Sequence, residues 1–116
     1  MNGENAASAP IEWLTLPEIA DALGESIGRV RRMLDDRQLV GSRREGPLKV
    51  PAAFVVDGEP LSSLRGTLFA LHDAGFADDE AIDWLFAPED SIGMPPIEAL
   101  LQGRKSEVRR VARALA

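Results

Sequence analysis

The sequence predicts a mainly α-helical protein that carries one short β-hairpin. Capped segments with apolar residues at helical spacing recur along the chain from Thr15 onward. Two short β-prone runs, Leu39–Arg43 and Leu48–Val50, flank a turn at residues 45–47. With 116 residues, 45% of them hydrophobic, the chain can form one small domain, or a small domain with a helical appendage.

The first predicted helix begins after Thr15. Thr15 and Glu18 have the spacing of a capping box, and Pro17 falls in the first turn, where its missing N–H costs little. Gly24 is suited to the left-handed backbone conformation that ends many helices. We expect the face formed by Leu16, Ile19, Ala20 and Leu23 to be buried.

Ser26 is a natural N-cap for a second helix over residues 27–36. The apolar side of this helix consists of Ile27, Val30, Met33 and Leu34. Its other side presents Gly28, Arg29 and Arg32, with Arg31 on the flank. The alternative is an ordinary pair of bundled helices, but the three arginines favour a helix that enters the major groove of DNA.

The predicted hairpin over residues 39–50 directly follows this helix, as a wing does in a winged helix-turn-helix. Its Arg43, Arg44 and Lys49 would contact the DNA backbone or the minor groove. A solvated hairpin whose charges protect an edge strand is the alternative. The net charge of the chain is −6, but residues 26–50 hold seven bases against three acids. Such a local basic face counts for more in DNA binding than the overall charge.

The chain beyond residue 57 predicts four further helices. They cover residues 61–75, 78–86, 97–101 and 107–115. Trp13 and Trp84 are expected in the core, and His72 at its margin. The last helix is basic, and it either contacts phosphates or presents Val108, Val111 and Leu115 to a second subunit, which makes a homodimer a hypothesis.

No enzymatic chemistry is predicted. The chain has no Cys or Tyr and a single His. The acidic residues Asp78–Glu80 have the pattern of a helix N-terminus and not of a cation site. We therefore expect no catalytic, metal or cofactor site. Neither a membrane span nor a signal peptide is expected, which favours a cytoplasmic protein. Residues 1–10 read as a disordered tail, residues 11–56 as the DNA-binding region and residues 57–116 as a helical region packed on it.

Particular motifs resemble a known family, the actinobacterial winged helix-turn-helix DNA-binding proteins typified by a mycobacterial substrate of a membrane Ser/Thr protein kinase. The most specific are Leu71-His-Asp-x-Gly75, Asp79-Glu80 and Trp84-Leu-Phe-x-Pro88. The resemblance implies a winged helix-turn-helix with a family-specific helical C-terminal region, DNA binding and control by phosphorylation. We expect a transcriptional regulator or nucleoid-associated factor that binds double-stranded DNA.

The resemblance also implies a Ser/Thr protein kinase as a partner. In that family the phosphorylated residue is a threonine of the N-terminal tail, and Ser8 is the only hydroxyl in the tail here. Two alternatives stay open. The C-terminal half resembles, more faintly, the toxin-binding segment of certain antitoxins, whose DNA-binding half would serve autorepression. An excisionase-like architectural protein is the other.

Overall fold

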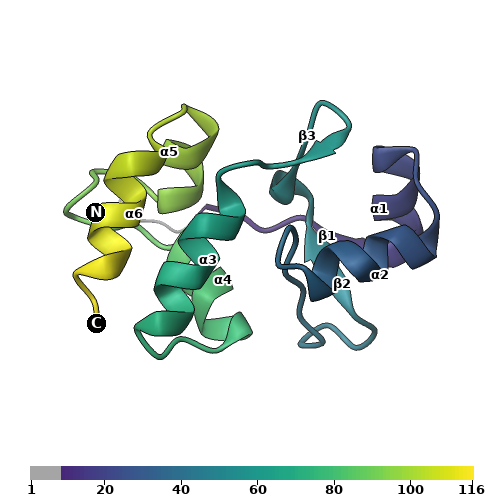
Figure 1. Ribbon diagram of the computed structural model, residues 1–116, viewed down its shortest axis with the longest axis horizontal. Coiled ribbons are helices and arrows are strands. Elements are labelled where there is room, and N and C mark those ends of the chain that lie inside the picture. Colours follow the sequence, from purple (N-terminus) through teal and green to yellow (C-terminus); the bar gives the residue numbers. More distant parts are fainter. Residues whose placement is uncertain (1–8) are drawn as a thin grey trace. The chain divides into compact units, whose positions relative to one another are not determined.

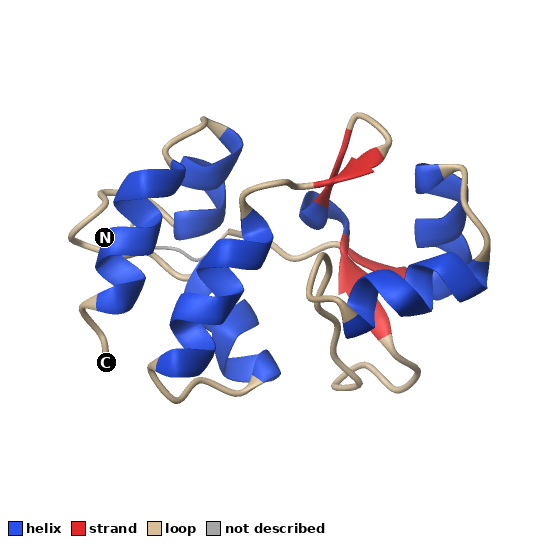
Figure 2. Ribbon diagram, in the orientation of Figure 1, coloured by secondary structure: helices blue, strands red, loops and turns tan. Residues whose placement is uncertain are grey.

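The computed structural model describes residues 9–116, which divide into two compact units. One unit is Ile11–Arg65, and the other is formed by Gly66–Ala116 together with residues 9 and 10. Of the tail expected at residues 1–10, all but these last two residues lie outside the described part. Figures 1 and 2 show helices in both units and short strands in the first.

The Ile11–Arg65 unit opens with strand β1 (Trp13–Thr15), helix α1 (Leu16–Leu23) and helix α2 (Ile27–Asp35). The predicted capping box is present: the Thr15 hydroxyl accepts a hydrogen bond from the Glu18 N–H at 3.2 Å, and the Glu18 carboxylate accepts one from the Thr15 N–H at 2.8 Å. Gly24 ends α1 with φ 65°, and the Ser26 hydroxyl caps α2. Both helix boundaries therefore follow from local sequence signals, as predicted.

The predicted hairpin is largely replaced by a different sheet. Strand β2 (Lys49–Pro51) pairs antiparallel with β1, with Leu14 opposite Val50, and not with residues 39–43. Of the hairpin only a bridge remains, in which Ser42 and Lys49 exchange two backbone hydrogen bonds of 2.9 and 3.0 Å. Leu39 and Val40 are both buried, but no ladder forms over residues 39–41, because β2 pairs with β1 instead.

A second small sheet follows in the same unit. A turn of 3-10 helix, η2 (Ala52–Phe54), leads into β3 (Val55–Val56), which pairs with β4 (Glu59–Pro60). Asp57 and Gly58 form the turn between them with positive φ. The sequence does not predict these two short strands.

Helix α3 (Leu64–Asp73) begins in the first unit and continues into the second, which also contains α4 (Asp78–Phe86), α5 (Pro96–Leu101) and α6 (Lys105–Arg113). These are the four helices that the sequence predicts, with shifted ends. The start of α4 is fixed by the Glu80 carboxylate, which accepts the Ala77 N–H at 2.9 Å. Helix α5 contacts both α4 and α6.

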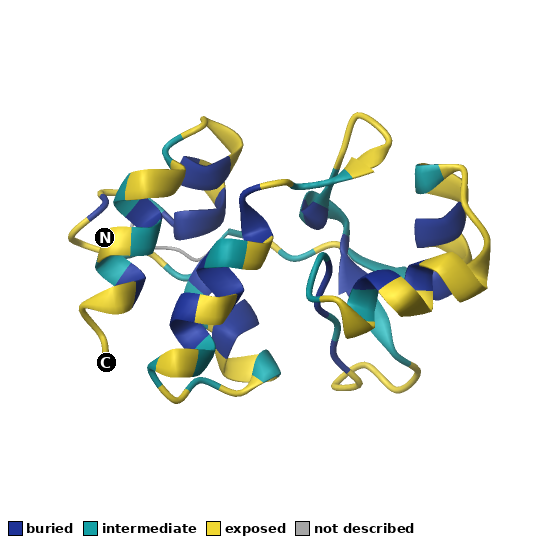
Figure 3. Cartoon of the chain, viewed as in Figure 1, coloured by how far each residue is buried: buried dark blue, intermediate teal, exposed yellow. Residues whose placement is uncertain are grey.

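Burial corrects several expectations (Figure 3). Ile27 is 41% exposed, because it lies in the first turn of α2, where the buried face begins only at Val30. Val108 is fully buried, so it cannot face a partner subunit. Trp13 and Trp84 are half-buried and not in the core.

Candidate nucleic-acid interface

The solvent-facing side of α2 is strongly basic. Arg29, Arg31 and Arg32 are exposed, whereas Val30 and Met33 are buried and fasten the helix to the unit. Within residues 9–116 none of these three guanidinium groups has a hydrogen-bond or ion-pair partner. The helix therefore presents three unneutralised positive charges to solvent.

The first turn of α2 allows a close approach of its backbone. Gly28 is exposed, and a Cβ added there would meet nothing nearer than the Ser26 hydroxyl at 3.9 Å. Ser26 itself is held in place, since its hydroxyl accepts the Arg29 N–H at 3.1 Å. Packing within the protein would thus allow a side chain at residue 28, and does not explain why the residue is glycine.

The wing, residues 42–49, brings further basic side chains to the same unit. Arg43 is exposed, and its guanidinium has no partner in the described part of the chain. Lys49 is half-buried on β2, where its backbone faces Thr15. The pKa of Glu18 lies below its ordinary value, chiefly because Thr15 hydrogen-bonds its carboxylate, and the positive charge of Lys49 adds to this effect.

Arg44 is placed differently from the other basic residues of the wing. Its guanidinium lies over the Trp13 ring, 5.3 Å from the ring centroid. The buried Ser42 hydroxyl accepts both the backbone N–H of Arg44 at 3.0 Å and its Nε–H at 3.3 Å. Sequence reasoning missed this arrangement, because nothing local links Trp13 to a residue so far along the chain.

Two open hollows flank the exposed arginines of α2. One, of about 340 Å³, is lined by Arg29 and Arg32 near the C-terminal end of the helix, together with Met33, Asp35, Asp36 and Gln38. The other, of about 260 Å³, has Arg31 on one side and Arg43 on the other, and we call it the α1–wing hollow. Its remaining lining consists of Thr15, Leu16, Pro17, Pro47 and Leu48. The structure thus brings Arg31 and Arg43 together at one depression.

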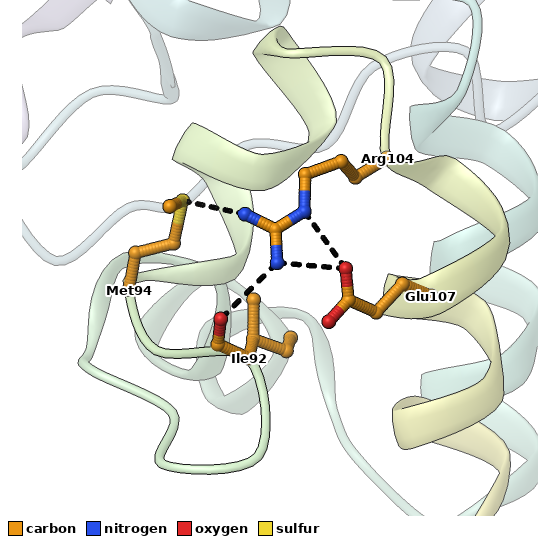
Figure 4. A network of polar contacts seen from close by, with 4 residues as sticks. All are labelled: Ile92, Met94, Arg104 and Glu107. Atoms are coloured by element: carbon orange, nitrogen blue, oxygen red, sulfur yellow. Dashed lines mark hydrogen bonds and ion pairs between the residues drawn. The ribbon is translucent and has the colours of Figure 1, made fainter.

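The basic helix α6 is partly engaged in internal contacts. Arg104 forms an ion pair of 2.7 Å with Glu107, and it also donates to the Ile92 carbonyl and to the Met94 sulfur (Figure 4). This bond to Arg104 lowers the pKa of Glu107. The Arg109 guanidinium packs against Gly66 of α3. Lys105, Arg110 and Arg113 remain exposed.

The described residues show no arrangement for metal binding. No group of three or more His, Asp or Glu side chains among residues 9–116 could hold a metal ion. His72, placed at the margin of the core by the sequence, is half-buried and lies 2.9 Å from an Asp78 carboxylate oxygen through its Nε2. No helix in the same range is long and apolar enough to cross a membrane. Ser8 lies outside the described residues, so phosphorylation there stays a prediction.

Comparison with known proteins agrees with this geometry. Two family models match, "DNA-binding protein Rv2175c, wHTH domain" over residues 3–55 and "Rv2175c C-terminal domain of unknown function" over residues 61–116. The DNA-binding protein Rv2175c of Mycobacterium tuberculosis is 34% identical, in an alignment that covers 87% of this chain and 78% of that protein.

A solved structure is also similar. The NMR structure of Rv2175c superposes with a TM-score of 0.81 at 30% identity, covering 97% of this chain and 92% of the other. These matches confirm the predicted fold class, a winged helix-turn-helix with a helical C-terminal region, and they describe a DNA-binding protein and not an enzyme. The chain therefore belongs to the family of the mycobacterial DNA-binding protein Rv2175c.

Proposed function

We propose that this protein binds double-stranded DNA through α2 and the wing, and acts as a transcriptional regulator or a nucleoid-associated factor in the cytoplasm. The observation that carries the proposal is the set of unpaired guanidinium groups on Arg29, Arg31, Arg32 and Arg43, in a protein with a net charge of −6. The printed name of the 34% identical relative, a DNA-binding protein, supports it.

In this proposal α2 lies in the major groove. Arg29 and Arg32 reach base edges, and Ser26 and Gly28 let the start of the helix approach the DNA closely. Arg31, Arg43 and Lys49 contact backbone phosphates. Arg44, expected from the sequence to contact phosphate as well, instead holds the wing in place through Trp13 and Ser42.

The acidic remainder of the chain sets the character of the binding. Outside residues 26–50 and 99–116, acids far outnumber bases, so long-range repulsion slows the approach to DNA. Affinity then depends on correct docking of the basic surface, and less on general attraction. This favours a protein that discriminates among sites over one that coats DNA evenly.

Two measurements test the proposal. Fluorescence anisotropy with labelled duplexes should give binding whose log K falls linearly with log[salt], and the absence of salt-dependent binding would refute DNA binding. Genome-wide immunoprecipitation then separates the two roles: discrete peaks upstream of genes indicate a regulator, and broad coverage indicates a nucleoid-associated factor.

A second role, protein binding by the C-terminal unit, is favoured by one observation. Phe69 and Leu115 are 45% and 41% exposed, and an open hollow of about 350 Å³ is lined by Phe69, Asp73 and Arg113. This surface suits a second subunit or a toxin-type partner. Ultracentrifugation of the purified protein tests for a second subunit. Mass spectrometry of proteins that co-purify with it tests for a different partner.

A further inference from the structure

We propose that the α1–wing hollow is the seat of a single DNA backbone phosphate, which Arg31 of α2 and Arg43 of the wing bind together. This inference rests on the proposed function and makes it more specific, since it assigns two arginines from separate elements to one ligand group. It also means that the wing and α2 contact the DNA backbone at the same phosphate.

The charges at the hollow are the first argument. Arg31 and Arg43 line the same depression, both are exposed, and neither has a counter-charge among residues 9–116. Two like charges facing one space repel each other, and the attraction of each charge to an anion between them offsets this repulsion. Guanidinium groups present planar pairs of N–H donors that match the oxygens of a phosphate.

The walls of the hollow are the second argument. They include Leu16 and Leu48, as well as Pro17 and Pro47, which have no backbone N–H to offer. The two arginine side chains are therefore the cationic groups that this lining offers to an anion. Thr15 is engaged with Glu18 through both its hydroxyl and its backbone N–H, and leaves the phosphate to the two guanidinium groups.

The rigidity of the wing is the third argument. Arg43 lies between Ser42, whose backbone is fixed to Lys49 by two hydrogen bonds, and Arg44, which packs on Trp13. The backbone of Arg43 is thus held at the hollow before any ligand arrives, and only its side chain has to be ordered on binding. The nearby acid, Glu18, is not part of the lining, and its carboxylate is already bound by the Thr15 N–H at 2.8 Å.

The salt dependence of DNA binding counts the phosphates and so tests the proposal. Each neutralised phosphate contributes about 0.9 to the slope of log K against log[salt] on duplex DNA. The probe is a fluorescein-labelled duplex of about two helical turns, titrated with the full-length protein and with Arg31→Ala, Arg43→Ala and the double variant. If the two arginines share one phosphate, the double variant loses about 0.9 in slope in total.

Separate phosphates would give a loss of about 1.8 in the double variant, and an unchanged slope would mean no phosphate contact; either result overturns the proposal. Arg65→Ala is the matched control, because it removes one positive charge from the same unit while its guanidinium is engaged with Asp36. Its slope should equal that of the wild type. If the wild type itself binds no DNA, the proposed function fails first, and the two failures are thereby distinguished.

Folding of the variants can be checked independently of DNA. Arg31 and Arg43 are exposed and make no side-chain hydrogen bond in the described residues, so thermal unfolding of the alanine variants should match the wild type. The charge-preserving pair Arg31→Lys and Arg43→Lys should keep the wild-type slope. Their loss of slope would overturn the shared-phosphate assignment as well, because the slope depends on charge alone.

Discussion

The guanidinium of Arg44 lies over the indole ring of Trp13, at 5.3 Å from the ring centroid, and so ties the wing to strand β1. Trp13 belongs to the strand that immediately precedes α1, and Arg44 belongs to the loop that follows α2. The Ser42 hydroxyl, which accepts the Arg44 Nε–H, fixes the guanidinium from a second side. Neighbouring arginines of the wing thus have different roles, with Arg44 turned to the protein and Arg43 to the solvent.

Removing this contact should loosen the wing without removing a phosphate contact. We expect Arg44→Ala to lower the free energy of unfolding by about 0.5–1 kcal/mol, the range of an exposed cation–π pair. Trp13 emission should shift, which can be measured in a Trp84→Phe background so that only one indole reports. The slope of log K against log[salt] should stay at the wild-type value, and a fall of about 0.9 would instead make Arg44 a phosphate contact.

Gly28→Ala should separate folding from DNA binding. The added methyl group meets no clash, since its nearest neighbours lie in ordinary van der Waals contact at 3.9 and 4.0 Å, and alanine is the better helix former by about 0.5–1 kcal/mol. Chemical denaturation should therefore show a more stable protein. DNA affinity should fall nevertheless, because the methyl group occupies the space where the helix approaches the duplex. Unchanged affinity would remove Gly28 from the interface.

Gly41→Ala is the contrasting glycine substitution, and it should destabilise the protein. A Cβ at residue 41 would lie 2.8 Å from the Lys49 carbonyl oxygen, which belongs to the backbone of β2 and accepts the Ser42 N–H. Relief of this clash requires the chain at residue 41 to move away from β2, and we expect the free energy of unfolding to fall by about 1–3 kcal/mol, which is typical of overpacking. Equal urea unfolding midpoints for Gly41→Ala and the wild type would show that the backbone near residue 41 shifts without loss of stability.

Local signals predicted the helices of this fold well. The caps at Thr15, Gly24 and Ser26 act over three or four residues, so the sequence alone identifies them, and the basic face of α2 follows from the same spacing. The pairing of Lys49–Pro51 with Trp13–Thr15 joins distant segments, and no short-range pattern specifies it. The sequence consequently predicted a local hairpin where a bridge and a long-range sheet occur.

The candidate site divides in the same way. The residue types and their exposure on α2 could be predicted, since a 3.6-residue period separates the arginines from Val30 and Met33. That Arg31 and Arg43 line one hollow, while Arg44 turns toward Trp13, depends on the path of the chain through residues 36–48. Burial of Val108 likewise depends on tertiary packing, and helical periodicity cannot distinguish a core face from an interface.

Acidification should weaken the C-terminal unit through Glu107. Its pKa is lowered by the hydrogen bond and ion pair from Arg104, so the folded state binds this proton less readily than the unfolded state. The stabilisation is therefore present above the ordinary carboxyl value of 4.5 and is lost as the pH falls below it. Unfolding midpoints of wild type and Glu107→Gln, measured from pH 7 downward, should converge below about pH 4.5.

Glu18 does not disturb this comparison. Its pKa is lowered as well, chiefly by Thr15, but it is present in both proteins and its contribution cancels. A constant difference between wild type and Glu107→Gln across the whole pH range would contradict a role for the charged carboxylate. Arg104 and its hydrogen bond to the Ile92 carbonyl would then be held without a contribution from the charge of Glu107.

Arg29 and Lys49 should differ in what they contribute to recognition. Arg29 lies on the exposed face of α2, and if it binds a guanine edge, Arg29→Ala should cost about 1–3 kcal/mol on the preferred duplex and relax specificity at that base pair. Lys49→Ala should weaken all sequences alike and reduce the salt slope. Competition titrations measure both effects, with a preferred duplex identified by immunoprecipitation and a scrambled duplex as competitors. Equal losses on the two duplexes for Arg29→Ala would assign Arg29 to the phosphate backbone, and sequence reading would then have to come from Arg32.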